Sequence, residues 1–367
     1  MSQYLLVMAW MVVIYVISNI TNVYQTEYVC GKKEVRVTWG FAILCVVPLI
    51  YWTATRDQWM FDTGIYVNNF KEMPETLTGM RTYMDSVNKD KGFSIVSIFI
   101  KAVIGNNVVL YLGILATFQL LLVTIVFRKY SSNYVLALFL FVATADYISW
   151  MHNGLRQFMA VALIFGATEL ILKKKYIPLI AIILLASTLH GSALLMLPIV
   201  FIVQGRPWNR KTLLAIGLFI LAIIYVENFT NLLDEMLADT QYTNVVSDWQ
   251  NWEDDGTNPI RVVIYSIPTL LSLVGYPYIK EAKNPVINMA CNMGVLSTML
   301  YCLSMVTSGI FMGRLPIYCS LYATGILLPW ELDNMFTEES ARIIKIFMTM
   351  AFIAFYYYQV QLTWNLL

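Results

Sequence analysis

The stretch that decides the fold is NVVLYLGILATFQLLLVTIVF, residues 107–127, which contains no charged side chain and is followed at once by Arg128 and Lys129. A helix of about 20 apolar residues is long enough to cross the hydrocarbon core of a bilayer. Similar apolar runs occur along the whole chain, so the sequence predicts an all-α polytopic transmembrane protein with about 11–12 spans in a single domain, residues 1–367. We place the spans at residues 3–20, 38–54, 107–127, 132–150, 154–172, 176–188, 191–203, 212–226, 261–279, 286–307, 310–330 and 343–360.

The composition agrees with a membrane protein. Hydrophobic residues make up 59% of the chain and charged residues only 13%, whereas soluble domains are about a quarter charged. The net charge of +1 gives no reason to expect nucleic acid as a partner. The five cysteines form no CxxC pair and no metal-ligand spacing, so we expect no disulfide framework, no metal and no cofactor. Residues 1–20 lack a basic segment and a cleavage site, which predicts a retained first span.

Two sizeable loops separate the predicted spans, at residues 55–106 and 227–260. Within the first loop, FSIVSIFIKAVI (93–104) is too short to span, and its polar residues recur at helical spacing. We interpret it as an interfacial or re-entrant helix, the alternative being a short core helix. The second loop carries eight acidic residues and no basic one. It reads as a solvated loop in which Trp249 and Trp252 could stack on sugar rings, although aromatic residues are also common at membrane interfaces.

The apolar run 176–203 is interrupted in its middle by polar residues from Ser187 to Ser192. A polar break costs several kcal/mol if it faces lipid, so it should face protein or water. One long tilted helix is possible, but two short, bent helices that meet at His190 fit better.

The Lys and Arg residues of short loops indicate the cytoplasmic side of the membrane. With a break at His190, all basic segments fall on that side, and both chain ends and both large loops fall on the other. Five polar residues then share the extracytoplasmic side, which predicts a polar cavity there between bent or broken helices. These residues are Asp62, His152, Arg156, His190 and Arg314.

Arg156 is the first candidate for chemistry, because an arginine in a span costs about 2.5–3.5 kcal/mol at mid-bilayer and needs a partner. His152 and Arg156 are four residues apart, as are Asn153 and Gln157, so a helix that begins near Asn153 carries a polar stripe on its first turns. Arginine beside a helix N-terminus makes a plausible cradle for a diphosphate. The alternative is a structural pair with Asp146, or a side chain that reaches the interface.

Arg314 is the second candidate, one turn into the span that starts near residue 310. Pro316 cannot donate a backbone hydrogen bond and loosens this helix, so that Arg314 and Tyr318 can line a polar cavity. A tolerated kink with a structural ion pair would leave the same pattern.

Asp62 and His190 are the candidate proton acceptors. A lone histidine is more often a structural hydrogen-bonding group than a base, but His190 lies at the break of a span, among hydroxyl side chains. Asp62, just outside the second span and four residues before Tyr66, could be a base, a metal ligand or a solvated loop residue.

At these residues the sequence resembles the EpsG/Wzy-type family of bacterial polysaccharide polymerases. The resemblance is carried by RDQWMFDTGIYVNNF (56–70), KGFSIVSIFIKAVIGNN (91–107), NGLRQFMAVALIFGATELILKKKY (153–176), LLASTLHGSALLMLPI (184–199) and GRLPIYCSLYATGILLP (313–329). The most specific feature is the order of these pieces, in which an Arg-Gln pair precedes a later histidine.

The resemblance implies an enzyme of the bacterial cytoplasmic membrane whose active site faces the periplasm or the exterior. Such an enzyme transfers a growing glycan from undecaprenyl diphosphate to the non-reducing end of another lipid-linked repeat unit, as in the synthesis of O-antigen, capsule or exopolysaccharide. Its partners would be these lipid-linked donor and acceptor molecules, membrane lipid, and the chain-length regulator and flippase of the same pathway.

Matched to this reaction, Arg156 and Arg314 would stabilise the diphosphate leaving group, and His190 or Asp62 would be the base. The further substrate-binding candidates are Tyr66, His152, Asn153, Gln157 and Tyr318. An O-antigen-ligase-like or polyprenyl-phosphate-sugar-dependent glycosyltransferase is the alternative enzyme. A flippase or transporter of lipid-linked oligosaccharide is the alternative of another class, but it should show internal repeats and polar groups through both halves of the bilayer.

Overall fold

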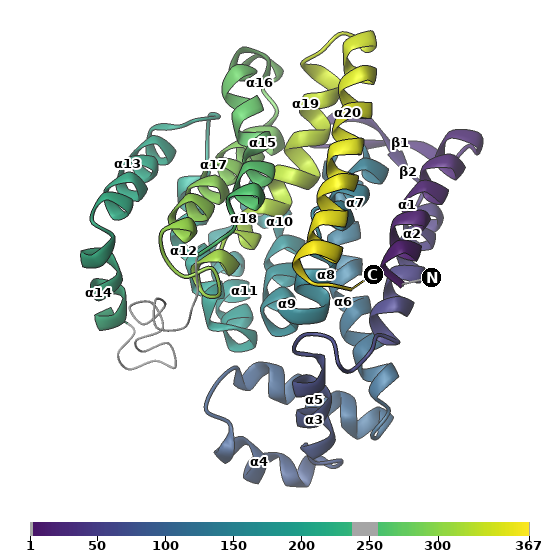
Figure 1. The fold of residues 1–367 in the computed structure, drawn as a ribbon, viewed down its shortest axis with the longest axis vertical. Coiled ribbons are helices and arrows are strands. Elements are labelled where there is room, and N and C mark those ends of the chain that lie inside the picture. Colours follow the sequence, from purple (N-terminus) through teal and green to yellow (C-terminus); the bar gives the residue numbers. More distant parts are fainter. Residues whose placement is uncertain (1–2, 237–255, 367) are drawn as a thin grey trace. The chain divides into compact units, whose positions relative to one another are not determined.

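The computed structural model describes residues 3–236 and 256–366 of the chain, and most of these residues are helical (Figure 1). The predicted all-α polytopic fold is therefore confirmed. The chain divides into two compact units, which we call the first unit (Met1–Leu197 and Lys345–Leu367) and the second unit (Pro198–Ile344).

The elements follow one another along the chain with short connections. Up to the break at His190 they are α1 (Gln3–Ile20), β1 (Tyr24–Val29), β2 (Lys32–Val37), α2 (Trp39–Ala54), α3 (Thr63–Glu72), η1 (Leu77–Gly79), α4 (Met80–Ser86), α5 (Lys91–Ile104), α6 (Val108–Tyr130), α7 (Tyr134–Ala143), α8 (Asp146–Ile148), η2 (Ser149–Asn153), α9 (Leu155–Gly166), α10 (Thr168–Leu172) and α11 (Tyr176–Leu189). Beyond it come η3 (Gly191–Leu195), α12 (Met196–Ile202), α13 (Arg210–Ile224), α14 (Val226–Met236), α15 (Pro259–Val274), α16 (Tyr276–Ala282), α17 (Pro285–Met305), η5 (Met312–Arg314), α18 (Ile317–Tyr322), η6 (Ala323–Leu327), α19 (Leu328–Asn334), α20 (Glu338–Tyr357) and η7 (Tyr358–Thr363).

By length and composition, four of the described helices can cross a membrane: α1, α6, α17 and α20 with η7. The number rises to seven if each of three bent helix pairs counts as one span. This is fewer than the number predicted from sequence, because several predicted spans are broken or are shorter than the hydrocarbon core is thick. The span predicted at 132–150, for example, bends by 69° between α7 and α8, where Ala145 has a positive φ of 64°.

Asparagine side chains begin many of these helices. An Asn oxygen accepts a backbone N–H of the first turn and so satisfies one of the groups that a helix leaves unpaired at its start. This capping occurs at Asn107 for α6, Asn133 for α7, Asn209 for α13, Asn258 for α15 and Asn284 for α17.

A two-stranded antiparallel hairpin, β1 and β2, joins α1 to α2 and was not predicted from the sequence. The strands are linked by Cys30 and Gly31, whose φ angles of 49° and 81° are both positive. A two-residue loop of this conformation matches the twist of a hairpin. The hairpin packs on the C-terminal end of α6, and the segment Thr21–Thr38 is therefore an ordered element and not a simple loop.

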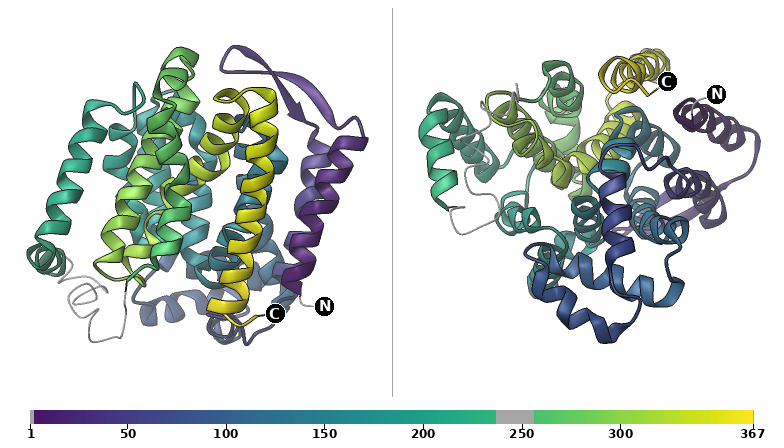
Figure 2. Two further views of the ribbon diagram at one scale, coloured as in Figure 1. Left: turned by 45° about the horizontal axis from the view of Figure 1, so that its top comes forward. Right: turned by 60° about the horizontal axis from the view of Figure 1, so that its bottom comes forward.

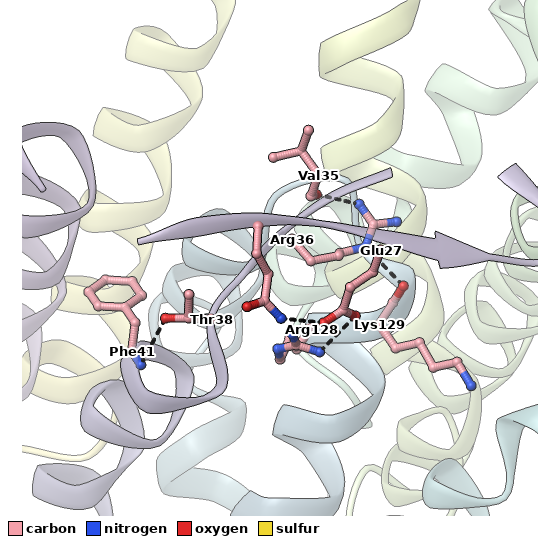
Figure 3. A network of polar contacts seen from close by, with 8 residues as sticks. Glu27, Val35, Arg36, Thr38, Phe41, Arg128 and Lys129 are labelled. Atoms are coloured by element: carbon pink, nitrogen blue, oxygen red, sulfur yellow. Dashed lines mark hydrogen bonds and ion pairs between the residues drawn. The ribbon is translucent and has the colours of Figure 1, made fainter. Parts of the chain in front are cut away.

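Arg128, at the end of α6, holds this hairpin through an ion pair (Figure 3). Its Nη1 donates to Glu27 Oε2 at 3.1 Å, its Nη2 contacts Glu27 Oε1, and its guanidinium lies 4.1 Å from the Trp39 ring centroid. Arg36 adds a hydrogen bond of 3.0 Å from Nε to the carbonyl of Lys129. Only 2% of the Arg128 side chain is exposed, so its charge depends on Glu27 for compensation.

The two ends of α6 carry different structures. Arg128 and the hairpin lie at its C-terminal end, whereas α3, α4 and α5 gather at its N-terminal end (Figures 1 and 2). A helix of 23 residues is about 34 Å long, close to the roughly 30 Å of a hydrocarbon core. At another side of the first unit, the C-terminal part of α20 lies beside α1, and Tyr356 donates to the carbonyl of Tyr4 at 2.9 Å.

The two predicted loops contain helices. Loop 55–106 holds α3, α4 and α5, and loop 227–260 begins with most of α14. Residues 237–255 of the acidic loop, including Trp249 and Trp252, lie outside the described residues. The interruption predicted at His190 is confirmed, because α11 ends at Leu189, and His190 has extended backbone with φ −160° and ψ 123°.

Candidate functional site

A cavity of about 200 Å³ lies within the first unit, between α3, α4, α5, α6 and α9. Its walls combine two cations, three tyrosines and several amide or hydroxyl groups with a few apolar side chains. Cavities that combine aromatic walls with a few polar groups are typical of ligand sites. The cavity is lined by Tyr66, Asn69, Met73, Tyr83, Val87, Asn88, Lys89, Phe93, Ser94, Tyr111 and Arg156.

Arg156 reaches the cavity from the first turn of α9, which begins at Leu155, close to the start predicted from the sequence. Its guanidinium lies 5.9 Å from the centroid of the Tyr66 ring and hydrogen-bonds to the Tyr66 hydroxyl, which also accepts the backbone N–H of Arg156. The same hydroxyl donates to the carbonyl of Asn153 at 3.4 Å. Tyr66 therefore holds the start of α9 and contacts the guanidinium of Arg156.

Asp90 is the ionic partner of Arg156, with 2.8 Å between Asp90 Oδ2 and Arg156 Nη1. The Asp90 side chain is 4% exposed and that of Arg156 30%. Burial raises the pKa of the Asp90 carboxyl, and the nearby Arg156 charge lowers it. The alternative prediction that Arg156 pairs with Asp146 is wrong: Asp146 accepts the indole N–H of Trp150 at 3.1 Å, and Asp90 occupies the place beside Arg156.

The Asp90 carboxylate also accepts the backbone N–H of Gly191, the residue that follows His190. The cavity is thus tied to the broken helix that the sequence singled out. His190 itself is half-buried, and its Nδ1 lies 2.7 Å from Ser192 Oγ. The imidazole is not among the groups that line the cavity, so its link to Arg156 runs through Gly191 and Asp90.

α5 and α11 meet at Gly92 with almost no space between them. A Cβ atom at Gly92 would lie 2.1 Å from Thr188 Oγ1 and 2.9 Å from the Thr188 carbonyl carbon. Since neighbouring atoms cannot approach so closely, only glycine lets the two helices pack at this distance. This contact sets the position of Asp90, just before α5, relative to Gly191, the first residue of η3.

The polar face of α5 points into the protein. Ser97 lies 3.0 Å from the Tyr111 hydroxyl, and Lys101, only 1% exposed, donates to the carbonyls of Phe70, Lys71 and Met73 at 2.9, 2.7 and 2.5 Å. Lys101 thereby satisfies the C-terminal end of α3. The opposite face is apolar and exposed at Ile95, Phe99 and Val103.

Arg56 is a buried cation that the sequence reasoning missed. Its Nε donates to Thr63 Oγ1 at 2.9 Å and its Nη1 to the carbonyl of Thr53 at 2.7 Å, and Thr63 in turn donates to the carbonyl of His152 at 3.3 Å. Burial lowers the pKa of Arg56 to about 10, so it remains charged at neutral pH. In the described parts of the chain it forms no ion pair with a carboxylate. The signal that could have found it is its place at the start of segment 56–70, the segment that also contains Asp62.

A known protein family covers most of this chain. The model of the EpsG family matches residues 41–363. The chain belongs to the EpsG family. No curated protein and no solved structure gives a significant match. The resemblance inferred from sequence is thereby confirmed, and the family supports a polysaccharide polymerase-type glycosyltransferase.

In this EpsG-family chain the structure separates the predicted site residues of the first unit into two groups. Tyr66 and Arg156 line the cavity, and Asn153 contributes its carbonyl to Tyr66. His152 is instead buried among other side chains, with Nε2 3.5 Å from Thr53 Oγ1 and its ring 5.3 Å from that of Tyr147. Gln157 is buried on α9.

Asp62 lies at the N-terminal end of α3, half-exposed and without a capping hydrogen bond from its side chain. Its backbone carbonyl accepts the N–H of Tyr66 at 3.1 Å. The carboxylate is not among the groups that line the cavity, so its predicted role as a base gains no support from this geometry.

Arg314 and Tyr318 of the EpsG-family chain belong to the second unit. Arg314 lies in the short turn η5 and not one turn into a helix, so that prediction is wrong. The regular helix α18 begins only after Pro316, because proline has no backbone N–H to donate to the preceding turn. Before it, the N–H of Gly313 donates to the carbonyl of Ser308 at 3.1 Å. Tyr318 is buried in α18.

We expect the contact at Gly92 to tolerate no side chain. Gly92→Ala should lower the free energy of unfolding by about 1–3 kcal/mol, because the added methyl group overpacks the contact with Thr188. Thermal unfolding of the purified protein in detergent measures the effect. Gly40→Ala is the matched control, since a Cβ there meets no atom within 4 Å. Equal unfolding temperatures for the two variants would contradict the proposed close packing.

Proposed function

We propose that this EpsG-family protein polymerises oligosaccharide repeat units linked to undecaprenyl diphosphate, by transferring the glycan of one lipid-linked chain to the non-reducing end of another. The observation that carries the proposal is the cavity in which Arg156 and Lys89 lie together with three tyrosines. Cationic side chains suit a diphosphate, and aromatic faces suit sugar rings.

The donor would bind with its diphosphate against Arg156 and Lys89 and its first sugar against the tyrosine walls. As the glycosidic bond breaks, the electron pair passes to the leaving diphosphate, whose negative charge increases. A guanidinium that already contacts the bound diphosphate when the glycosidic bond breaks stabilises that charge without having to reorganise during the reaction. Tyr66 keeps Arg156 beside the cavity through its contacts with Arg156 and Asn153.

The acceptor hydroxyl must lose a proton as the new bond forms. Neither His190 nor Asp62 lines the cavity, and we propose His190 as the base because Gly191 connects the His190 break to Asp90 and Arg156. An unperturbed imidazole titrates near pH 6.5, which suits proton transfer at neutral pH. Arg314 and Tyr318 are retained as proposed diphosphate and substrate ligands on the basis of the resemblance of segment 313–329, and Gln157 and His152 as further substrate-binding residues.

The lipid part of the substrate would lie along α5. Phe93 and Ser94 of this helix line the cavity, and Ile95, Phe99 and Val103 form an exposed apolar stripe that continues from it. A polyprenyl chain could thus remain in apolar surroundings while its diphosphate enters the cavity.

We further propose that the protein resides in the bacterial cytoplasmic membrane with this cavity on the extracytoplasmic side. The basic hairpin lies at the other end of α6, and the bias of Lys and Arg toward the cytoplasm supports that orientation. A chain-length regulator and a flippase of the same pathway would be its partners.

The test is incubation of the purified protein in nanodiscs with synthetic undecaprenyl-diphosphate-linked repeat units, with and without EDTA. We expect a ladder of glycans that EDTA does not change. Absence of any new glycosidic bond would overturn the proposal in favour of a transporter. Loss of the ladder with EDTA would favour a metal-dependent glycosyltransferase, and transfer of a single unit to a terminal acceptor would favour a ligase.

A further inference from the structure

We propose that Asp90 is a positioning residue: its carboxylate holds Arg156 while the cavity is empty, and the diphosphate takes its place when substrate binds. This inference rests on the proposed function, because it assigns the diphosphate to Arg156. The residue pattern of the sequence does not single out Asp90.

The ion pair has one fixed member and one mobile member. Asp90 stands between the cavity residue Lys89 and the helix α5, its backbone is left-handed with φ 51°, and its side chain is 4% exposed. Its carboxylate is also held by the N–H of Gly191. The tight contact between Gly92 and Thr188 packs the start of α5 directly against α11. Asp90 is therefore fixed by elements on two sides.

Arg156 has more freedom. Its side chain is 30% exposed and lines the cavity, and an arginine side chain has several rotatable bonds between its backbone and its guanidinium. The guanidinium can turn from Asp90 toward an anion in the cavity without any movement of α9. The Tyr66 ring beneath it provides a surface on which the planar group remains in contact during this turn.

Two anions then compete for one guanidinium. In the empty cavity Asp90 compensates the charge of Arg156 and keeps the side chain ordered. A bound diphosphate must displace Asp90, so part of its binding energy is used in breaking the ion pair. After transfer, Asp90 can reclaim Arg156 and thereby help the charged product to leave. A residue of this kind weakens product binding and speeds turnover.

Asp90→Asn tests the inference, because asparagine keeps the shape and the hydrogen-bond acceptor for Gly191 but removes the charge. We expect inorganic pyrophosphate and undecaprenyl diphosphate, each titrated into the nanodisc-embedded protein, to bind about tenfold more tightly than to the wild type. In the polymerisation assay both KM for the lipid-linked donor and kcat should fall. Asp85→Asn is the matched control, since it removes the same charge from an exposed position on α4.

The inference would be overturned if Asp90→Asn bound both anions only as tightly as Asp85→Asn does. It would also be overturned if Asp90→Asn bound both anions more weakly, because Asp90 would then only maintain the fold of the site. The double variant Asp90→Asn with Arg156→Gln must lose the gain in affinity, or Arg156 is not the group released. Tighter binding of undecaprenyl diphosphate alone would assign the effect to the lipid and also overturn it. If the wild type forms glycan but Asp90→Asn does not change anion binding, this inference fails and the proposed function stands. If the wild type forms no glycan, the proposed function itself fails.

Discussion

Arg156→Gln is expected to lower the rate of polymerisation by about 100- to 1000-fold, the usual cost of removing a donor that stabilises developing negative charge. Glutamine can still donate hydrogen bonds toward the cavity, but it carries no charge to offset that of the leaving diphosphate. Arg156→Lys should retain more activity than Arg156→Gln, though less than the wild type, because an ammonium group cannot contact two phosphate oxygens in the plane of a guanidinium. Initial rates of glycan formation from a synthetic lipid-linked donor measure both effects.

Arg81→Gln provides the control for Arg156→Gln. Arg81 is an exposed arginine on α4, so its loss changes the net charge equally without altering the wall of the cavity. We expect its activity to stay within about twofold of the wild type, as for surface substitutions in general. If Arg156→Gln polymerises as fast as Arg81→Gln, then Arg156 does not stabilise the leaving group.

Glu27→Gln is expected to have the largest effect on stability. It leaves the buried charge of Arg128 without its partner, and breaking a buried ion pair in this way costs about 3–5 kcal/mol. Because 30% of the Glu27 side chain is exposed, water partly screens the pair, and we expect the free energy of unfolding to fall by only about 2–3 kcal/mol. Unfolding of the purified protein, followed by circular dichroism in a mixed detergent titration, measures the loss.

Glu34→Gln is the matched control, since Glu34 lies directly opposite Glu27 in the hairpin and its ion pair with Arg36 is longer, at 3.6 Å. Its effect should be within about 0.5 kcal/mol, because removing one of two facing carboxylates also relieves repulsion. Equal losses from the two substitutions would show that Arg128 does not depend on Glu27.

The stability difference between wild type and Glu27→Gln should also depend on pH. The hydrogen bond from Arg128 lowers the pKa of the Glu27 carboxyl below its ordinary value of 4.5. A carboxylate whose pKa is lowered by folding stabilises the protein fully above its ordinary pKa and loses this contribution as the pH falls through the lowered one. The two proteins should therefore differ fully above about pH 4.5 and converge in stronger acid.

Local patterns along the chain were enough to predict that the protein is helical and that a helix is interrupted at His190. Long apolar runs can form helices in a bilayer whatever their neighbours are, because a helix satisfies its backbone groups internally. A run of hydroxyl side chains and a glycine within such a segment leaves backbone groups that need other partners, so the residue pattern at 187–192 is sufficient to indicate the break. The position of Arg156 on the first turn of α9 follows from the same reasoning.

The β1–β2 hairpin was not predicted from the sequence. The positive charges of its residues indicate a side of the membrane, but they do not indicate a secondary structure. The local signal for a hairpin was Gly31, which readily adopts the positive φ of a two-residue loop, between two short segments that contain aromatic and β-branched residues. What stabilises the hairpin is Arg128, about a hundred residues later, and no local pattern contains that contact.

Sequence by itself determined that this chain is a helical membrane protein of the EpsG family, that a helix breaks at His190 and that Arg156 lies in the first turn of another helix, because these features depend on local composition and on segments that the family shares. Tertiary structure alone decided the partners of the charged groups. Among the described residues, Arg156 pairs with Asp90 and not with Asp146, Lys101 closes the end of α3, and Arg56 is buried without an ion pair to a carboxylate. The physical reason is that an ion pair or a buried charge is set by distances of a few ångströms between helices, and sequence separation does not fix those distances.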